Sequence, residues 1–216
     1  MVKCPSCGRL EESRLICEQC GSPLAANLDL FSALGLPRKL AIDTGALERV
    51  YHELGRRMHP DRFASSPTAV RTASLHATSL LTRAYRTLRD PVTRGLYWLE
   101  LSGEKLAENN KQVPAELAEL VFNVQEQLAE LREAQARSAT AVRALRDQAA
   151  QRRNQIVAAA NGAHEELNRN FARWDSDGAA DRKALTPDLK AALSKIAYLR
   201  TLLRDIDREL ENAKAA

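Results

Sequence analysis

Apolar residues recur at every third or fourth position through most of the second half of the chain. The second of three such stretches runs from Val142 to Trp174, and the third runs from Leu189 to Leu210. The first stretch holds Leu117, Leu120, Val124, Leu128 and Leu131. This spacing places the apolar side chains on one face of a helix. Three such stripes with short joins predict an antiparallel three-helix bundle over residues 114–216.

Two local signals bear on the helix boundaries of this bundle. Asn161-Gly162 lies inside the second stripe and could bend or interrupt that helix. Thr186-Pro187-Asp188 has the composition of a helix start, so we expect the third helix to begin there.

Residues 28–103 carry the pattern and punctuation of a smaller helical unit. A short apolar segment at 28–34 stops at Gly35-Leu36-Pro37, and a helix capped by Asp43 or Thr44 should run to about Met58. The next helix should begin at Ser66-Pro67 and close near residue 89, and a short fourth one should follow Asp90-Pro91 and end at Gly103. The long helix of this unit carries Leu75, Thr78 or Ser79, Thr82 and Tyr85 along its length.

Composition and charge change this picture only slightly. The chain has 216 residues, of which 44% are hydrophobic and 28% are charged, and this is ordinary globular composition. Residues 1–103 hold 14 Lys/Arg and 10 Asp/Glu, so the formal net charge of +4 lies entirely in the front half. A basic surface there could meet nucleic acid or an acidic protein. No apolar run is long enough to span a bilayer and no signal-peptide pattern is visible, so we expect a cytoplasmic protein.

The first 26 residues contain all four cysteines of the chain. They form two C-x-x-C pairs, Cys4 with Cys7 and Cys17 with Cys20, and a glycine follows each pair. Zinc prefers four tetrahedral ligands, and each C-x-x-C turn can present two thiolates to one ion. We therefore predict a structural zinc site; disulfides and redox-active pairs are the alternatives, and iron could replace zinc in the cell. Because the segment is poor in apolar residues, metal should supply much of its stability.

A His-Pro-Asp tripeptide, His59-Pro60-Asp61, lies between the two longer helices of the 28–103 unit. In this position it resembles the loop of J domains. The segments 27–37, 59–63, 84–97 and 193–199 also resemble the HscB family of co-chaperones, and the resemblance covers about residues 27–212. Some HscB relatives carry an N-terminal pair of C-x-x-C motifs.

The resemblance implies an all-α fold: a helical J domain, then a three-helix bundle, preceded by a small zinc-binding knuckle module. We accordingly divide the chain into the zinc module at 1–26, the J domain at 27–103, a linker at 104–113 and the scaffold-binding bundle at 114–216. It also implies a co-chaperone that stimulates a DnaK/HscA-type ATPase and delivers to it an IscU-type iron–sulfur scaffold protein.

The resemblance further implies which residues contact each partner. His59, Pro60 and Asp61 would contact the chaperone, although His59 and Asp61 could instead only cap a helix. Arg49, Arg56 and Arg57 on the preceding helix could steer an acidic chaperone surface, or they could simply be solvated. The expected scaffold-binding residues are Val121, Phe122, Glu126 and Glu130, with Phe122 either an exposed anchor or part of the core.

Other functions are less compatible with the sequence. It has none of the phosphate-binding or nucleophile motifs of common enzymes, so we expect no intrinsic catalysis. A zinc-containing nucleic-acid-binding protein would need aromatic residues for stacking, and residues 1–26 have none. A general J-domain co-chaperone for unfolded clients is the other alternative. We expect neither nucleic acid nor a membrane among the partners.

Overall fold

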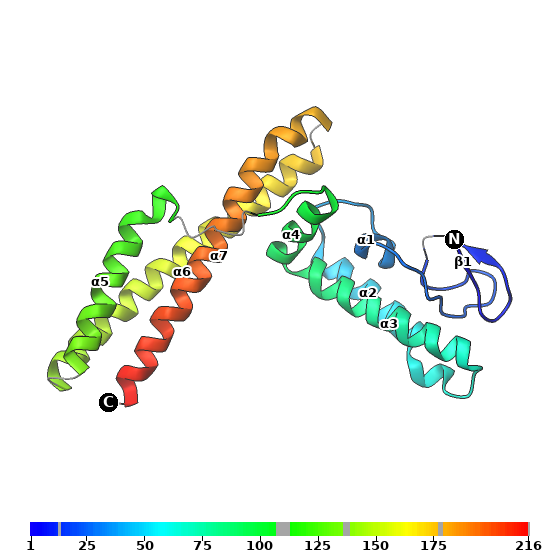
Figure 1. Cartoon of the computed structure of the whole chain (residues 1–216), viewed down its shortest axis with the longest axis horizontal. Helices are drawn as coiled ribbons and strands as arrows, with labels where there is room; N and C mark the ends of the chain where they lie inside the picture. Colours follow the sequence, from blue (N-terminus) through cyan, green and yellow to red (C-terminus); the bar gives the residue numbers. More distant parts are fainter. Residues whose placement is uncertain (13, 107–112, 136–138, 177–178, 216) are drawn as a thin grey trace. The chain divides into compact units, whose positions relative to one another are not determined.

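A computed structural model of the chain describes residues 1–12, 14–106, 113–135, 139–176 and 179–215 (Figure 1). The chain forms two compact units, Met1–Leu101 and Ser102–Ala216. The described residues are mostly helical, which confirms the expected fold class. Among the described residues, no helix has both the length and the apolar composition of a membrane-spanning helix.

The first unit begins with a small element that the sequence pattern did not predict. Strands β1 (Val2–Lys3) and β2 (Leu10–Glu11) pair antiparallel, with Val2 opposite Glu11. The helices that follow are α1 (Leu30–Ala33), α2 (Thr44–Met58), α3 (Thr68–Arg89) and α4 (Pro91–Leu101), with a 3₁₀ turn, η1 (Pro60–Phe63), between α2 and α3.

Helix α2 begins and ends where local chemistry requires. The Asp43 carboxylate accepts hydrogen bonds from the backbone N–H groups of Gly45 and Ala46, at 2.8 and 3.0 Å. At the other end, Pro60 keeps His59 out of the helical region, so α2 stops at Met58. Both boundaries agree with the sequence expectation.

The inner face of α3 consists of residues that the sequence pattern did not single out. The buried positions are small or aliphatic residues, and Leu75, which the sequence pattern singled out, is 60% exposed. The true stripe consists of Val70, Ala73, Ser74, Ala77, Leu81, Ala84 and Leu88. Small side chains let α2 approach α3 closely, whereas a search for large apolar residues favours the wrong side of the helix.

The second unit is an antiparallel bundle of α5 (Ala118–Gln135), α6 (Ala139–Ser176) and α7 (Ala179–Ala215), with a 3₁₀ turn, η2 (Ala115–Leu117), before α5. Gln127 of α5 bonds Gln148 of α6 at 3.1 Å, and Arg153 of α6 pairs with Asp207 of α7 at 2.5 Å. In each pair, the two residues lie at similar sequence distances from the connection between their helices, as facing residues of antiparallel helices do.

Two boundaries in the bundle correct the sequence expectation. Helix α6 runs through Asn161-Gly162 without a break. Helix α7 begins at Ala179 rather than at Thr186, and Pro187 lies inside it. Tertiary packing along the Leu189–Ile206 stripe outweighs the hydrogen bond that the proline removes.

Candidate functional site

The four cysteines converge at the N-terminal end of the first unit. All are free thiols, and their sulfur atoms lie within 4.8 Å of one another. The Sγ atoms of Cys4 and Cys20 are 3.6 Å apart, and those of Cys7 and Cys17 are 3.7 Å apart. A tetrahedral ion with Zn–S bonds of about 2.3 Å requires sulfur–sulfur separations of about 3.8 Å. The donor set and its spacing therefore fit a four-thiolate metal site.

The two C-x-x-C turns have the same backbone geometry. The Cys4 N–H donates to the Arg9 carbonyl at 2.7 Å, and the Cys17 N–H donates to the Ser22 carbonyl at 2.9 Å. Gly8 and Gly21 each donate back to the cysteine four residues earlier and adopt φ values of +76° and +70°. A residue with a side chain would be strained at such φ values, which explains the glycine after each pair.

The thiols of the cluster differ in their protonation. Burial raises the pKa of Cys4, but the backbone N–H groups of Cys7 and Ser6 lower it more, to about 7. Burial raises the pKa of Cys17 to about 12. A metal ion that binds both must therefore displace a firmly held proton from Cys17, so metal affinity should fall as the pH falls.

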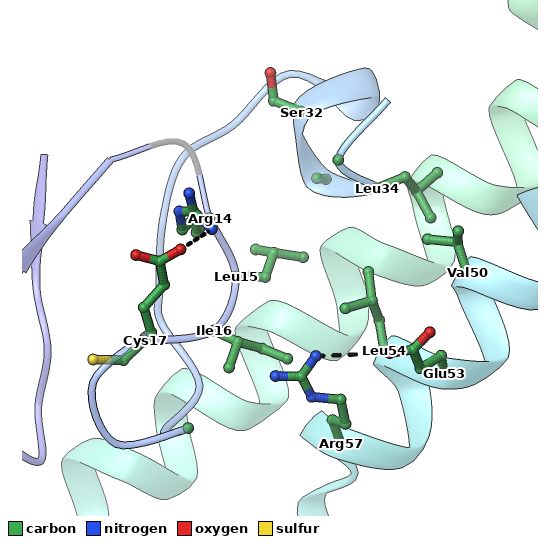
Figure 2. A pocket seen from close by; sticks show the side chains of 14 residues that line it. Arg14, Leu15, Ile16, Cys17, Ser32, Leu34, Val50, Glu53, Leu54 and Arg57 are labelled. Atoms are coloured by element: carbon green, nitrogen blue, oxygen red, sulfur yellow. Dashed lines mark ion pairs between the residues drawn. The ribbon is translucent and has the colours of Figure 1, made fainter. Parts of the chain in front are cut away.

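The cysteine segment is joined to the helices by two apolar residues that the sequence pattern did not single out. Leu15 and Ile16 are buried in the same cluster as Phe31 and Leu47. Figure 2 shows both pointing toward α2, along a groove of about 550 Å³. Only their position just before Cys17 in a polar segment could have marked them. The cysteine cluster and the helical core are thus parts of one folded unit.

Charged pairs border this groove without closing it. Arg14 pairs with Glu18 at 2.5 Å on the cysteine side, and Arg57 pairs with Glu53 at 3.8 Å on α2 (Figure 2). Both pairs are between residues four apart and about half exposed, so they add little stability. They leave a groove with an apolar floor and neutral rims.

The His-Pro-Asp turn projects from the end of α2. The Nδ1 atom of His59 accepts a hydrogen bond from the Asp61 backbone N–H at 3.3 Å, so a neutral imidazole keeps its proton on Nε2. The His59 side chain is 57% exposed and that of Asp61 is 90% exposed. Both side chains are thus accessible to a partner, and the cap that His59 provides is compatible with this.

Side-chain hydrogen bonds from α3 fix the position of this turn. The Ser74 and Thr78 hydroxyls both donate to the Met58 carbonyl, at 2.7 and 3.2 Å. They satisfy a carbonyl that the end of α2 leaves without a helical partner. These two hydrogen bonds therefore hold the start of the turn against α3. Arg49, Arg56 and Arg57 are all exposed on α2.

The expected scaffold-binding residues divide into two groups on α5. Phe122 is 66% exposed, and Glu126 and Glu130 are exposed on the same side of the helix. Val121 is buried in the bundle core. The exposed face therefore combines one aromatic side chain with acidic residues, while Val121 packs behind it.

Lys195 of α7 fixes the start of α5. Its ammonium lies 2.9 Å from Glu116 in η2 and 3.4 Å from Glu166 in α6, and its side chain is only 17% exposed. Burial alone would lower the pKa of Lys195, but the carboxylates of Glu116 and Glu166 raise it above its usual value. The charged lysine thus ties η2 to the other two helices.

The sequence has relatives among known co-chaperones, although no family model matches it. It is 38% identical over 91 residues to a co-chaperone protein HscB homolog of Chromobacterium violaceum, covering 42% of this chain and 52% of that protein. It is 43% identical over 75 residues to an HscB homolog of Aromatoleum aromaticum, covering 35% of this chain and 42% of that protein. The chain thus spans about half the length of the curated relatives it matches.

Solved structures share the fold over most of the chain. Human co-chaperone protein HscB superposes with a TM-score of 0.62 and 23% identity, covering 95% of this chain and 96% of that one. Chaperone HscB from Vibrio cholerae superposes with a TM-score of 0.57 and 20% identity, covering 84% and 96%. The chain is therefore similar in sequence to HscB homologs over 75–91 residues, and it shares the fold of solved HscB structures over most of its length.

Proposed function

We propose that the chain is a non-enzymatic co-chaperone that stimulates the ATPase of a DnaK/HscA-type chaperone and delivers an IscU-type iron–sulfur scaffold to it. The observation that carries this proposal is the exposed His-Pro-Asp turn, supported on α3 through the Met58 carbonyl, in a homologue of HscB. Pro60 stiffens the turn, which reduces the ordering cost on binding. Arg49, Arg56 and Arg57 would steer an acidic chaperone surface toward it.

The bundle would hold the scaffold through α5. Phe122 is the proposed anchor, and Glu126 and Glu130 are the proposed polar contacts around it. Val121 supports this face from the core rather than touching the partner. Holding both partners on one chain raises their effective concentration, so scaffold capture and ATP hydrolysis become coupled.

Zinc is the metal that we propose for the four cysteines. Cys4, Cys7, Cys17 and Cys20 would fill all four tetrahedral positions, which leaves none for substrate, so the ion would be structural. Its contribution would be to hold the two C-x-x-C turns together. Because Leu15 and Ile16 lie in the same core cluster as Met58, the residue before His59, that support would extend to the His-Pro-Asp turn.

Steady-state ATP hydrolysis tests this function. The protein and the scaffold are added singly and together to an HscA-type chaperone from the same organism. We expect synergistic stimulation that Asp61→Asn removes without changing scaffold affinity. Phe122→Ala should weaken scaffold binding and leave the scaffold-independent stimulation intact, whereas Gln125→Ala, an exposed neighbour on α5, should change neither. Stimulation that does not depend on the scaffold would instead indicate a general J-domain co-chaperone.

A further inference from the structure

Helix α3 presents an unusual surface on the side opposite its buried stripe. The helix contains four arginines and no acidic residue. Arg71, Arg83 and Arg86 are exposed, and Leu75 lies among them with 60% of its surface exposed. Arg71 lies 4 residues before Leu75, and Arg83 and Arg86 lie 8 and 11 residues after it, so all four residues lie on the half of the helix that faces away from the buried stripe. We call these four residues the α3 face.

The charges of the α3 face are not neutralised within the part of the chain that the structure describes. No described acidic residue forms an ion pair with Arg71, Arg83 or Arg86, whereas on α2 Arg57 has Glu53 beside it. The uncompensated charge of α3 alone equals the formal net charge of the whole chain, +4. The positive excess seen in the sequence therefore has a definite location.

The N-terminal part of α3 is held next to the His-Pro-Asp turn. Ser74 and Thr78, which flank Leu75 on the helix, donate to the carbonyl of Met58, the residue before His59. The first turns of α3 are therefore held directly beside the turn. A protein that contacts His59 and Asp61 with a standard-sized interface, about 800 Å² on each partner, would reach beyond the turn onto neighbouring elements.

We infer that the α3 face is a second contact surface for the DnaK-type chaperone, which would meet it with acidic residues around an apolar patch. This inference rests on the proposed function. In it, Leu75 is the apolar contact and the three arginines supply electrostatic attraction. The His-Pro-Asp turn stimulates ATP hydrolysis by the chaperone, and the α3 face adds affinity and orients the chaperone on this chain.

Leu75 favours a protein over a nucleic acid as the occupant. An exposed leucine among arginines gives no contact that a phosphate backbone can use, but it fits an apolar patch on a protein surface. An aromatic ring for base stacking is also missing from this face: Tyr85 is the aromatic residue of α3, its ring stacks on Tyr51 at 4.1 Å between centroids, and the Arg89 guanidinium lies over it.

Two variants of the full chain test the inference against matched controls. Leu75→Ser removes the apolar contact, and its control is Leu96→Ser, an exposed leucine on α4 of the same unit. The triple variant Arg71→Glu, Arg83→Glu and Arg86→Glu reverses the charge of the face, and Arg169→Glu on α6 is the charge-reversal control in the other unit. Circular dichroism and thermal unfolding verify that each variant is folded.

Affinity for the purified, ATP-bound HscA-type chaperone is measured at low and high salt, together with ATPase stimulation. We expect Leu75→Ser to weaken binding about fivefold. The triple variant should weaken it more than about tenfold at low salt, with a smaller loss at high salt. Leu96→Ser and Arg169→Glu should bind as the unmodified chain does.

The outcomes separate the two proposals. If Asp61→Asn removes stimulation while both α3 variants bind normally, the α3 inference is wrong and the proposed function stands. If Asp61→Asn has no effect, the proposed function is wrong, and the α3 inference fails with it. Loss of duplex DNA binding in the triple variant, with chaperone affinity unchanged, would overturn the inference in favour of a nucleic-acid surface.

Discussion

The interiors of the cysteine segment and of the helical bundle are stabilised in different ways. The small interior of the cysteine segment consists of Cys4, Cys17, Leu24 and Ala26. The interior of the bundle is aliphatic and aromatic, with Leu128, Ile156, Leu167, Phe171, Ile196, Leu199 and Ile206 among its fully buried residues. Thiol groups stabilise such a small core mainly through a shared metal, whereas apolar area stabilises the bundle directly. The comparison predicts that the cysteine segment depends on a bound metal for its stability and that the bundle does not.

Loss of a metal ligand should give the largest effect and should be confined to the first unit. Cys17→Ser removes one of four thiolates, and structural zinc sites contribute an apparent binding free energy on the order of 10 kcal/mol. We expect bound zinc to fall from one equivalent toward none. Hydrogen exchange should speed up around Leu15 and Ile16 and in α2, while α6 and α7 keep their protection.

Ser6→Ala is the control for this variant, because it changes an exposed residue in the other C-x-x-C turn and keeps all four ligands. A chelator should reproduce the Cys17→Ser result in the unmodified chain. Equal loss of protection in both units would show that the bundle also depends on the metal and would contradict the comparison.

The bundle should respond to loss of apolar volume and not to the metal. Leu199 is fully buried on α7, so Leu199→Ala should lower the free energy of unfolding by about 3 kcal/mol. Urea unfolding followed by circular dichroism, with and without chelator, measures this difference. The loss should be the same in both conditions, and Arg208→Ala, an exposed change on the same helix, should cost far less. A chelator-dependent loss would mean that the two units are coupled.

The same contrast explains what the sequence could and could not predict. The bundle stripes and the C-x-x-C pairs are local patterns of large or chemically distinct residues, so both were predicted and the structure bears them out. The inner face of α3 was missed because alanine and serine supply much of it. Leu15 and Ile16 were missed because their partners, such as Leu47, are distant in the sequence. The start of α7 was misplaced because packing overrides the local signal of Pro187.

The junction between the cysteine segment and the helices should be an intermediate case. Leu15 is buried against the core, so Leu15→Ala should cost about 2 kcal/mol. The variant should still bind one equivalent of zinc, because no ligand changes, yet the thermal midpoint of the first unit should fall. Leu10→Ala, an exposed leucine in the same segment, is the matched control. If Leu15→Ala leaves the thermal midpoint unchanged, the cysteine segment does not contribute to the stability of the helices of the first unit.

The smallest expected effect is a loss of stability at low pH, which should occur in the first unit and not in the bundle. The Asp29 carboxylate caps α1 by accepting from the N–H groups of Phe31 and Ser32 at 3.0 and 3.1 Å, and Arg38 donates to it at 2.9 Å. Burial raises its pKa, but Arg38 and Ser32 lower it further, so the net pKa is below the usual value. A carboxyl with a lowered folded-state pKa stabilises the fold above its unfolded pKa of about 3.9. That stability is lost as the pH falls through the folded-state pKa.

Asp29→Asn should therefore lower the free energy of unfolding of the first unit by about 1 kcal/mol at pH 7, where the carboxylate is charged. Below the folded-state pKa the difference should vanish, because Asp29 itself is then neutral. Urea unfolding of both chains from pH 7 down to about pH 2, with the unfolding of α5–α7 as the internal reference, measures this convergence. A constant difference at every pH would show that the geometry of the cap matters and its charge does not. A matching acid loss in the bundle would remove the contrast between the two units.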